Sequence, residues 1–214
     1  MKNMEVIEIF KSIQGESSYS GRLCSFVRLK GCNLNCVWCD TEYAVNENGT
    51  VLDVGEIVSL VKQHHTKLVE ITGGEPLLQD STPRLCSEFL DRGYTVLVET
   101  NGSLDIGKLP SGVLRIIDIK CPDSGEGLSF RMDNLDLLTK QDECKFVVAS
   151  VKDLNWASSF IKKHDLTSRC TLFLSPAGGL IGSCEVADFI VENSMDVRLG
   201  VQLHKLIWGE RRGV

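Results

Sequence analysis

Long apolar runs are missing from this sequence of 214 residues. No stretch approaches the roughly 18 consecutive apolar residues of a membrane-spanning helix. The first residues, Met1-Lys2-Asn3-Met4-Glu5, carry charge where a signal peptide needs its apolar stretch. We therefore expect a soluble, cytoplasmic protein with no membrane partner.

Long basic runs are missing as well. Lys and Arg number 23 against 29 Asp and Glu, which gives a formal net charge of −6 and a pI near 5.3. A nucleic-acid-binding domain needs a positive patch to neutralise phosphates. The charge balance therefore disfavours a nucleic-acid partner, and an anionic substrate would need a local cation.

A disulfide framework is not expected, because nine cysteines are an odd number and no export signal accompanies them. Three of the nine gather in one motif. The other six are predicted to behave as small buried apolar side chains. These six are Cys24, Cys86, Cys121, Cys144, Cys170 and Cys184.

The rest of the chain is organised around Gly31–Thr41, where Cys32, Cys36 and Cys39 stand at C-x3-C-x2-C spacing directly after an apolar strand. A [4Fe–4S] cluster normally takes four thiolates. Three can hold three of its irons, and the fourth iron then stays open to chelate a small molecule. The spacing predicts an iron–sulfur reaction centre.

A zinc site is the alternative interpretation of these cysteines. A structural zinc ion takes four ligands, so a further Cys or His should follow nearby. The nearest histidines, His64 and His65, lie well downstream inside a helical pattern. A zinc-stabilised binding module without catalysis would be colourless, whereas a cluster is brown.

Apolar runs alternate with helical patterns, which is typical of a parallel α/β sheet. The predicted strands are 5–10, 24–29, 68–71, 95–98, 114–119, 144–148, 171–174 and 197–201. Several are continuous β-branched runs, as expected of strands buried on both faces. The predicted helices are 54–65, 83–92, 153–164 and 184–193.

Two stretches between strands leave little room for helices. Residues 101–114 and 122–130 are rich in glycine and polar residues. We therefore expect an α/β fold in the form of a partial, trimmed and open TIM-like barrel, with about six parallel strands, a reduced set of helices and an N-terminal strand. No repeat or linker divides the sequence, so residues 1–214 are predicted to form a single domain around the cysteine motif.

Polar clusters follow the predicted strands at their C-terminal ends, where parallel barrels build their sites. The clusters are Gly31-Cys32, Thr72-Gly73-Gly74-Glu75-Pro76, Glu99-Thr100-Asn101-Gly102, Lys120-Cys121-Pro122, Ser175-Pro176-Ala177-Gly178-Gly179 and Gln202-Leu203-His204. Because they share one rim, we predict that they line one pocket.

The three cysteines after one strand and Gly73-Gly74-Glu75-Pro76 after the next resemble the radical S-adenosylmethionine (SAM) superfamily. The resemblance implies that the open iron chelates SAM and that the Gly-Gly-Glu segment receives the amino group of SAM. The physics agrees, since glycines allow close backbone approach and a carboxylate accepts from an ammonium. Taken alone, the segment is also typical of a tight turn into a helix.

Further motifs resemble one family in this superfamily, the 7-carboxy-7-deazaguanine synthases. They are Ser12-Ile13-Gln14-Gly15-Glu16-Ser17, Gly21-Arg22, Phe26-Val27-Arg28-Leu29, Asp40-Thr41, Glu99-Thr100-Asn101-Gly102, Asp118-Ile119-Lys120 and Gln202-Leu203-His204-Lys205. These motifs are specific as a set, and the resemblance covers nearly the whole chain.

The resemblance implies an enzyme that converts 6-carboxy-5,6,7,8-tetrahydropterin to 7-carboxy-7-deazaguanine with loss of ammonia, on the route to 7-deazapurines such as queuosine. It implies a [4Fe–4S] cluster, SAM and Mg²⁺ as cofactors, a homodimer, and a low-potential electron donor such as flavodoxin or ferredoxin. In such enzymes the radical derived from SAM takes a hydrogen from C6 of the substrate. The cofactors supply the radical, and the protein supplies orientation and protection from water.

The site residues are implied by the family pattern at matching positions. Substrate binding is implied for Gln14, Gly15, Glu16, Arg28, Thr72, Glu99 and His204. SAM binding is implied for Gly74, Glu75, Thr100, Asn101, Ser150 and Ser175. The implied metal ligands are Cys32, Cys36 and Cys39 for the cluster and Thr41 for Mg²⁺. Lys120 and Lys145 are further candidates for contacts with the cluster or SAM.

Simpler roles compete for three of these residues. Arg28 can pair with a substrate carboxylate, or it can be an outward residue of an alternating strand. Thr41 can bind Mg²⁺, which keeps most of its waters, or it can cap a helix. His204 can contact the substrate or be structural.

A second radical SAM class, the glycyl-radical activases, shares the three cysteines and the Gly-Gly-Glu segment but acts on a protein. Gln14-Gly15-Glu16 and Asp40-Thr41 argue against this alternative. Stimulation of turnover by Mg²⁺ with a pterin substrate would separate the two classes.

Overall fold

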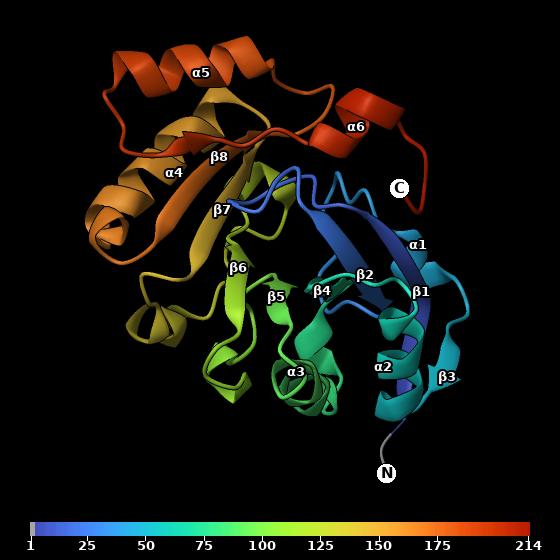
Figure 1. Cartoon of the computed structure of the whole chain (residues 1–214). Helices are drawn as coiled ribbons and strands as arrows, with labels where there is room; N and C mark the ends of the chain where they lie inside the picture. The colour runs from blue at the N-terminus through green and yellow to red at the C-terminus, as the bar shows by residue number, and fades with distance from the viewer. Residues whose placement is uncertain (1–2) are drawn as a thin grey trace.

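A nine-stranded sheet is the centre of the computed structural model, which describes residues 3–214 (Figure 1). The strands are β1 (Met4–Ile13), β2 (Leu23–Leu29), β3 (Thr50–Leu52), β4 (Leu68–Gly73), β5 (Thr95–Thr100), β6 (Leu114–Asp118), β7 (Glu143–Val148), β8 (Thr171–Pro176) and β9 (Arg198–Leu199). Their order is β3-β1-β2-β4-β5-β6-β7-β8-β9.

The sheet has the predicted form of an open barrel. β1 pairs antiparallel with β2 and β3, and each neighbouring pair from β2 to β9 is parallel. The sheet ends at β3 on one side and at β9 on the other. β9 is shorter than the predicted strand 197–201, because only Arg198 and Leu199 pair with β8.

The helices lie on the outside of the sheet and at its rim. They are α1 (Tyr43–Asn46), α2 (Val54–Lys62), α3 (Thr82–Leu90), α4 (Val151–Lys163), α5 (Ser183–Glu192) and α6 (Leu203–Trp208). The 3₁₀ turns are Pro76–Leu78, Ile106–Lys108, Pro122–Ser124, Met132–Leu137 and Leu166–Ser168. Figure 1 shows the chain leaving α6 and turning back toward α1, where it ends.

The four predicted helices are present as α2 to α5. Asp53 starts α2 through a capping box, because its side chain accepts from the Glu56 N–H and the Glu56 side chain accepts from the Asp53 N–H. The stretches predicted to lack full helices hold only 3₁₀ turns. The sequence pattern does not predict α1, α6 or β3, because such short elements show no clear period.

The alternation of strand side chains divides the apolar residues into two cores. The larger one lies between the sheet and its helices and includes Ile71, Val98 and Phe146. The smaller one, here called the inner apolar cluster, lies on the opposite face of the strands and consists of Cys24, Phe26, Leu68, Leu97 and Ile116. It fills the interior of the barrel below the carboxyl ends of the strands.

Five of the six cysteines outside the motif are buried, as predicted, and all nine cysteines are free thiols. The prediction is wrong for Cys184, which is exposed near the start of α5. Of the residues of that helix, only Val186 is fully buried. Phe189 and Ile190 pack partly buried against the larger core, while Cys184 lies on the exposed face of the helix. In residues 3–214, no helix is both long and apolar enough to cross a membrane.

Candidate active site

Directly above the inner apolar cluster, the inward side chains become charged. Each strand presents every second residue to the interior, so the next inward residue lies two positions further along. Phe26, Leu68, Leu97 and Ile116 are followed in this way by Arg28, Glu70, Glu99 and Asp118. With Lys145 of β7, these four residues are here called the charged layer, and all five line the same cavity.

The cavity has a volume of about 970 Å³, at the large end of the range for small-molecule sites. All six polar clusters predicted to share the rim contribute to its wall, among them Cys32, Gly74, Asn101, Ser175 and His204. The prediction of one pocket is therefore confirmed. The carboxyl ends of the parallel strands bring these loops together.

Lys145 pairs with carboxylates from three parts of the cavity wall. Its Nζ lies 2.7 Å from an oxygen of Glu16 and 2.6 Å from an oxygen of Glu99, and 3.8 Å from Asp118. Burial alone would lower the pKa of Lys145, but the surrounding carboxylates raise the pKa well above its ordinary value. Lys145 is therefore a cation at neutral pH, and it fixes two of the residues implied to bind the substrate.

Glu70 is the residue of this layer that sequence reasoning missed most clearly. It is buried, and burial together with the nearby Glu99 raises its pKa to about 8. Gln14 donates from Nε2 to Glu70 at 2.9 Å, and its Oε1 accepts from the Glu16 N–H. The amide of Gln14 is thus held by protein groups, and Glu70 forms part of the cavity wall.

Arg28 points into the cavity, which rules out the outward alternative. Its Nε donates to Glu8 at 2.7 Å. Thr72 also lines the cavity and donates to Glu99 at 3.1 Å. Within the charged layer, Lys145 is held by Glu16 and Glu99, so Arg28 supplies the guanidinium that can pair with an anion.

The Gly-Gly segment touches the beginning of the cysteine motif. Gly73 has a φ of +134°, a conformation that L side chains rarely adopt. A Cβ on Gly74 would overlap the carbonyl oxygen of Gly31, and the Glu75 N–H donates to that oxygen at 2.7 Å. Glycine is required here because two backbones meet.

The three motif cysteines lie on one loop at the cavity wall, where Cys32 and Cys36 are partly buried and Cys39 is exposed. Within residues 3–214, no group of three or more Cys, His, Asp or Glu side chains is arranged to hold a single metal ion. The Cys32 Sγ accepts from the Leu34 N–H at 3.5 Å, and Lys120 lies near enough to attract a Cys36 thiolate. Three thiols beside a cation on an open wall fit an anionic cluster.

Glu75 does not line the cavity, contrary to its predicted contact with SAM. Its side chain is fully buried and accepts from the Leu77 N–H, the Thr100 hydroxyl and the Asn101 N–H at 2.7 to 2.9 Å. These protein donors occupy the carboxylate. Thr100 and Asn101 do line the cavity, so Glu75 fixes the loop that carries them.

Ser150 is also outside the cavity, and its predicted contact with SAM has no support from its position. It is the N-cap of α4, where its side chain accepts from the Asp153 N–H and donates to Asp123. A serine that follows a strand and precedes a helix serves as a cap when its hydroxyl turns back on the helix. Ser175 lies on the cavity wall instead.

Thr41 lines the cavity and does not cap α1. The N-cap of α1 is Glu42, and no side chain caps that helix. The Thr41 hydroxyl lies 3.8 Å from the Cys39 Sγ. Its neighbour Asp40 is paired with Lys205 and accepts from Gln202, each at 3.3 Å.

Gly15 and His204 meet at the cavity rim. A Cβ on Gly15 would overlap the imidazole of His204, and the Leu203 N–H donates to the Gly15 carbonyl at 2.8 Å. His204 lies in α6 rather than at a strand end. Both residues line the cavity, so α6 closes over the loop between β1 and β2.

Known proteins resemble this chain over most of its length. Residues 26–117 match the model of the Radical SAM superfamily. The chain is 44% identical to the 7-carboxy-7-deazaguanine synthase of Koribacter versatilis over 99% of this chain and 100% of that protein. It belongs to the 7-carboxy-7-deazaguanine synthase family.

A second relative agrees with that assignment, and a solved structure shows the same fold. The family member of Chlorobaculum tepidum is 41% identical, covering 99% of this chain and 97% of that protein. The crystal structure of QueE from Escherichia coli has the same fold, with a TM-score of 0.76 and 20% identity over 94% of this chain and 95% of that chain. The family assignment leaves no support for the zinc-binding module.

Sequence reasoning missed Glu8 and Glu70. It named Lys145 together with Lys120 as a candidate for ligand contacts but could not choose between them. The signal for Glu70 was the strand period, because Glu70 follows the inward residue Leu68 by two positions. Glu8 carried no such signal, since a bulge in β1 shifts the pairing register between Val6 and Glu8.

Proposed function

We propose that this chain converts 6-carboxy-5,6,7,8-tetrahydropterin to 7-carboxy-7-deazaguanine with loss of ammonia, as a carbon–nitrogen lyase in 7-deazapurine biosynthesis. One observation carries the proposal: a single cavity joins the three-cysteine loop to an inward-facing arginine in a chain of this family. The cysteines serve a cluster, and the arginine serves a carboxylate.

The loop residues Cys32, Cys36 and Cys39 would hold a [4Fe–4S] cluster, with SAM on its open iron. When bound, the cluster and SAM supply a radical that abstracts hydrogen. The chain provides the surroundings: Gly74 lets backbone approach the amino group of SAM, while Thr100, Asn101 and Ser175 line its path. Glu75 would contribute indirectly, because its carboxylate accepts hydrogen bonds from Thr100 and Asn101 and so fixes their positions.

The charged layer would hold the substrate above the inner apolar cluster. Arg28 pairs with the substrate carboxylate through its Nη atoms. Glu16 and Glu99, fixed by Lys145, accept from the pterin N–H groups, and Thr72, Gly15 and His204 complete the wall. A rigid set of acceptors orients the ring, so that one C–H faces the site of radical formation.

Thr41 would bind Mg²⁺ through its hydroxyl. The residue lies on the cavity wall with that hydroxyl unused as a helix cap, and Mg²⁺ commonly takes one or two protein oxygens while keeping several waters. Substrate oxygens would complete the shell. The ion would then neutralise the substrate carboxylate together with Arg28.

The enzyme would also need an electron source and is proposed to be a homodimer. A low-potential donor such as flavodoxin or ferredoxin would approach the exposed side of the cysteine loop, where Val37 is exposed. Apolar side chains on α6, among them Leu206 and Ile207, are exposed as well. Such patches are typical of contact surfaces.

The proposal is tested with anaerobically reconstituted protein, SAM, a chemical reductant, Mg²⁺ and 6-carboxytetrahydropterin. We expect mass spectrometry to detect 7-carboxy-7-deazaguanine. Cys36→Ala should lose iron and product together, whereas Cys184→Ala, which changes an exposed thiol on α5, should retain both. Release of 5′-deoxyadenosine without any deazaguanine would refute the substrate assignment.

A further inference from the structure

The bulge in β1 brings Glu8 to the face of Arg28. Val6 pairs with Leu29 and Glu8 pairs with Arg28, so β1 advances two residues while β2 advances one. An inserted residue of this kind switches the face on which the following side chains lie. Val6 therefore packs under the helices, while Phe10, two residues after Glu8, packs against the inner apolar cluster.

The Glu8 carboxylate accepts from three side chains. Its Oε1 accepts from the Arg28 Nε at 2.7 Å and from the Tyr43 hydroxyl at 3.0 Å. Its Oε2 accepts from the Arg212 Nε at 3.0 Å. Burial alone would raise the pKa of Glu8, but these donors lower it, so the group is a carboxylate at neutral pH. Glu8 does not line the main cavity itself.

Arg28 keeps one end of its guanidinium available. Glu8 accepts from the Nε, and within residues 3–214 neither Nη of Arg28 donates a hydrogen bond to a protein acceptor. The Phe10 and Tyr43 rings lie 5.8 and 5.6 Å from the guanidinium carbon. Glu8 and the two rings thus hold the guanidinium on one side, and Arg28 lines the cavity with its Nη donors free of protein acceptors in residues 3–214.

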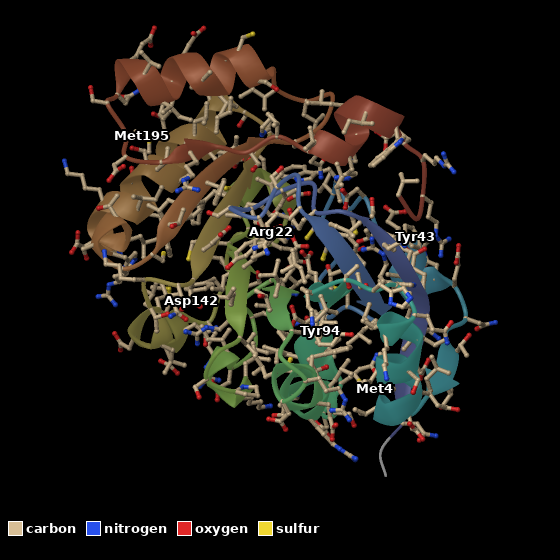
Figure 2. The ribbon with its side chains drawn as sticks, viewed as in Figure 1. Met4, Arg22, Tyr43, Tyr94, Asp142 and Met195 are labelled. Atoms are coloured by element: carbon tan, nitrogen blue, oxygen red, sulfur yellow. The ribbon has the colours of Figure 1, made fainter. Side chains whose placement is uncertain are left out.

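Residues 209–214, here called the C-terminal segment, reach the same place from the other end of the chain and line the cavity. Arg212 stacks on the Tyr43 ring at 3.9 Å and also pairs with Glu47 at 2.8 Å. Tyr43 lies on the side of the molecule where the chain ends (Figure 2). The Tyr43 ring therefore contacts two guanidinium groups, and Glu8 joins the same two groups by hydrogen bonds.

We propose that Glu8 is a positioning residue that holds Arg28 and Arg212 together against Tyr43, so that seating of the C-terminal segment and orientation of Arg28 are coupled. This inference rests on the proposed function for the anion that Arg28 binds. Without the Glu8 charge, two guanidinium groups would share one aromatic ring with no anion between them. Arg28 would lose its orienting acceptor, and Arg212 would lose one of the two carboxylates that pair with it.

The first test compares Glu8→Gln with Glu5→Gln, a matched change on β1 whose carboxylate is half exposed and pairs with Lys30 at 3.2 Å. We expect Glu8→Gln to raise the KM for the pterin carboxylate at least about tenfold, the size of one lost charge-assisted hydrogen bond, with kcat changed far less. Glu8→Asp should recover part of the affinity. A KM for Glu8→Gln equal to that of Glu5→Gln overturns the proposal.

The second test needs no turnover. Trypsin can cleave after Lys205, Arg211 and Arg212, so mass spectrometry of the released C-terminal peptides reports the exposure of the C-terminal segment. Cleavage should be several times faster in Glu8→Gln than in the wild type or Glu5→Gln, and an unchanged rate overturns the proposal.

If Glu8→Gln does not fold, the variant Arg212→Gln replaces it. The proposal then requires that Arg212→Gln raise both the KM for the pterin and the rate of cleavage after Lys205. A wild type without pterin turnover would refute the proposed function, while proteolysis would still decide the role of Glu8.

Discussion

The ammonium of Lys145 on β7 lies 2.6 Å from a carboxylate oxygen of Glu99 on β5, across the intervening strand β6. Because Glu16 accepts from the same ammonium, one buried cation holds acids from two parts of the cavity wall. Removing one partner from such a set leaves an uncompensated buried charge.

Lys145→Met should therefore lower the free energy of unfolding by about 3–5 kcal/mol at pH 7. Lys152→Met, a change of an exposed lysine paired with Asp123, should change stability far less, because solvent screens a surface ion pair. Burial would raise the pKa of Glu16, but Lys145 lowers it. The stability from this pair is thus present above the unfolded pKa of Glu16 and is lost as the pH falls, so urea titrations should show the Lys145→Met deficit shrinking toward acid pH.

Glu70→Gln should change how stability depends on pH. The pKa of Glu70 is raised to about 8, first by burial and then by Glu99, so between its unfolded pKa and pH 8 only the unfolded state releases the proton. The wild type should lose up to about 1.4 kcal/mol of stability per pH unit over that range. The isosteric neutral variant lacks this slope, and parallel profiles from pH 5 to 8 would contradict the buried, protonated acid.

Gly74→Ala should destabilise the protein and impair cluster binding. The new Cβ would overlap the Gly31 carbonyl, and forcing two backbones apart costs about 1–3 kcal/mol. Gly178→Ala is the matched control, because a Cβ there meets nothing within 4 Å. Thermal unfolding and bound iron per chain should fall for Gly74→Ala alone, and equal iron content in both variants would count against the close approach.

The variant Ser150→Ala distinguishes two roles of Ser150, a helix cap and a contact with SAM. Loss of the cap should lower the free energy of unfolding by about 1 kcal/mol, because the Asp153 N–H loses its acceptor. The KM for SAM should stay at the wild-type value, whereas Ser175→Ala on the cavity wall should raise it. A raised KM for SAM in Ser150→Ala would restore the role that the family pattern implies.

Much of the fold could be predicted because its signals are local. The strand runs, the capping residue Asp53 and the glycine-rich gaps each depend on a few neighbouring residues. The short elements α1, β3 and α6 were missed because three to six residues carry no period. Cys184 was misplaced because exposure depends on which face of α5 meets the sheet.

The sequence by itself determined the cysteine loop and the shared rim. The covalent chain fixes how far apart Cys32, Cys36 and Cys39 can lie. Parallel strands bring the loops at their carboxyl ends together, whatever the details of side-chain packing. The period of two also puts Arg28 on the same face as Phe26 and Glu70 on the same face as Leu68. That this face is the inner one emerged only from the folded sheet.

Only the tertiary structure decided which polar side chains remain available for a ligand. Glu75 is occupied by protein donors and Ser150 by a helix end, while Arg28 is oriented by Glu8. Arg212 meets Glu8 although 204 positions separate them in the chain. Hydrogen bonds depend on distance in space, and the bulge of β1 and the return of the C-terminal segment set that distance only after the whole chain has folded.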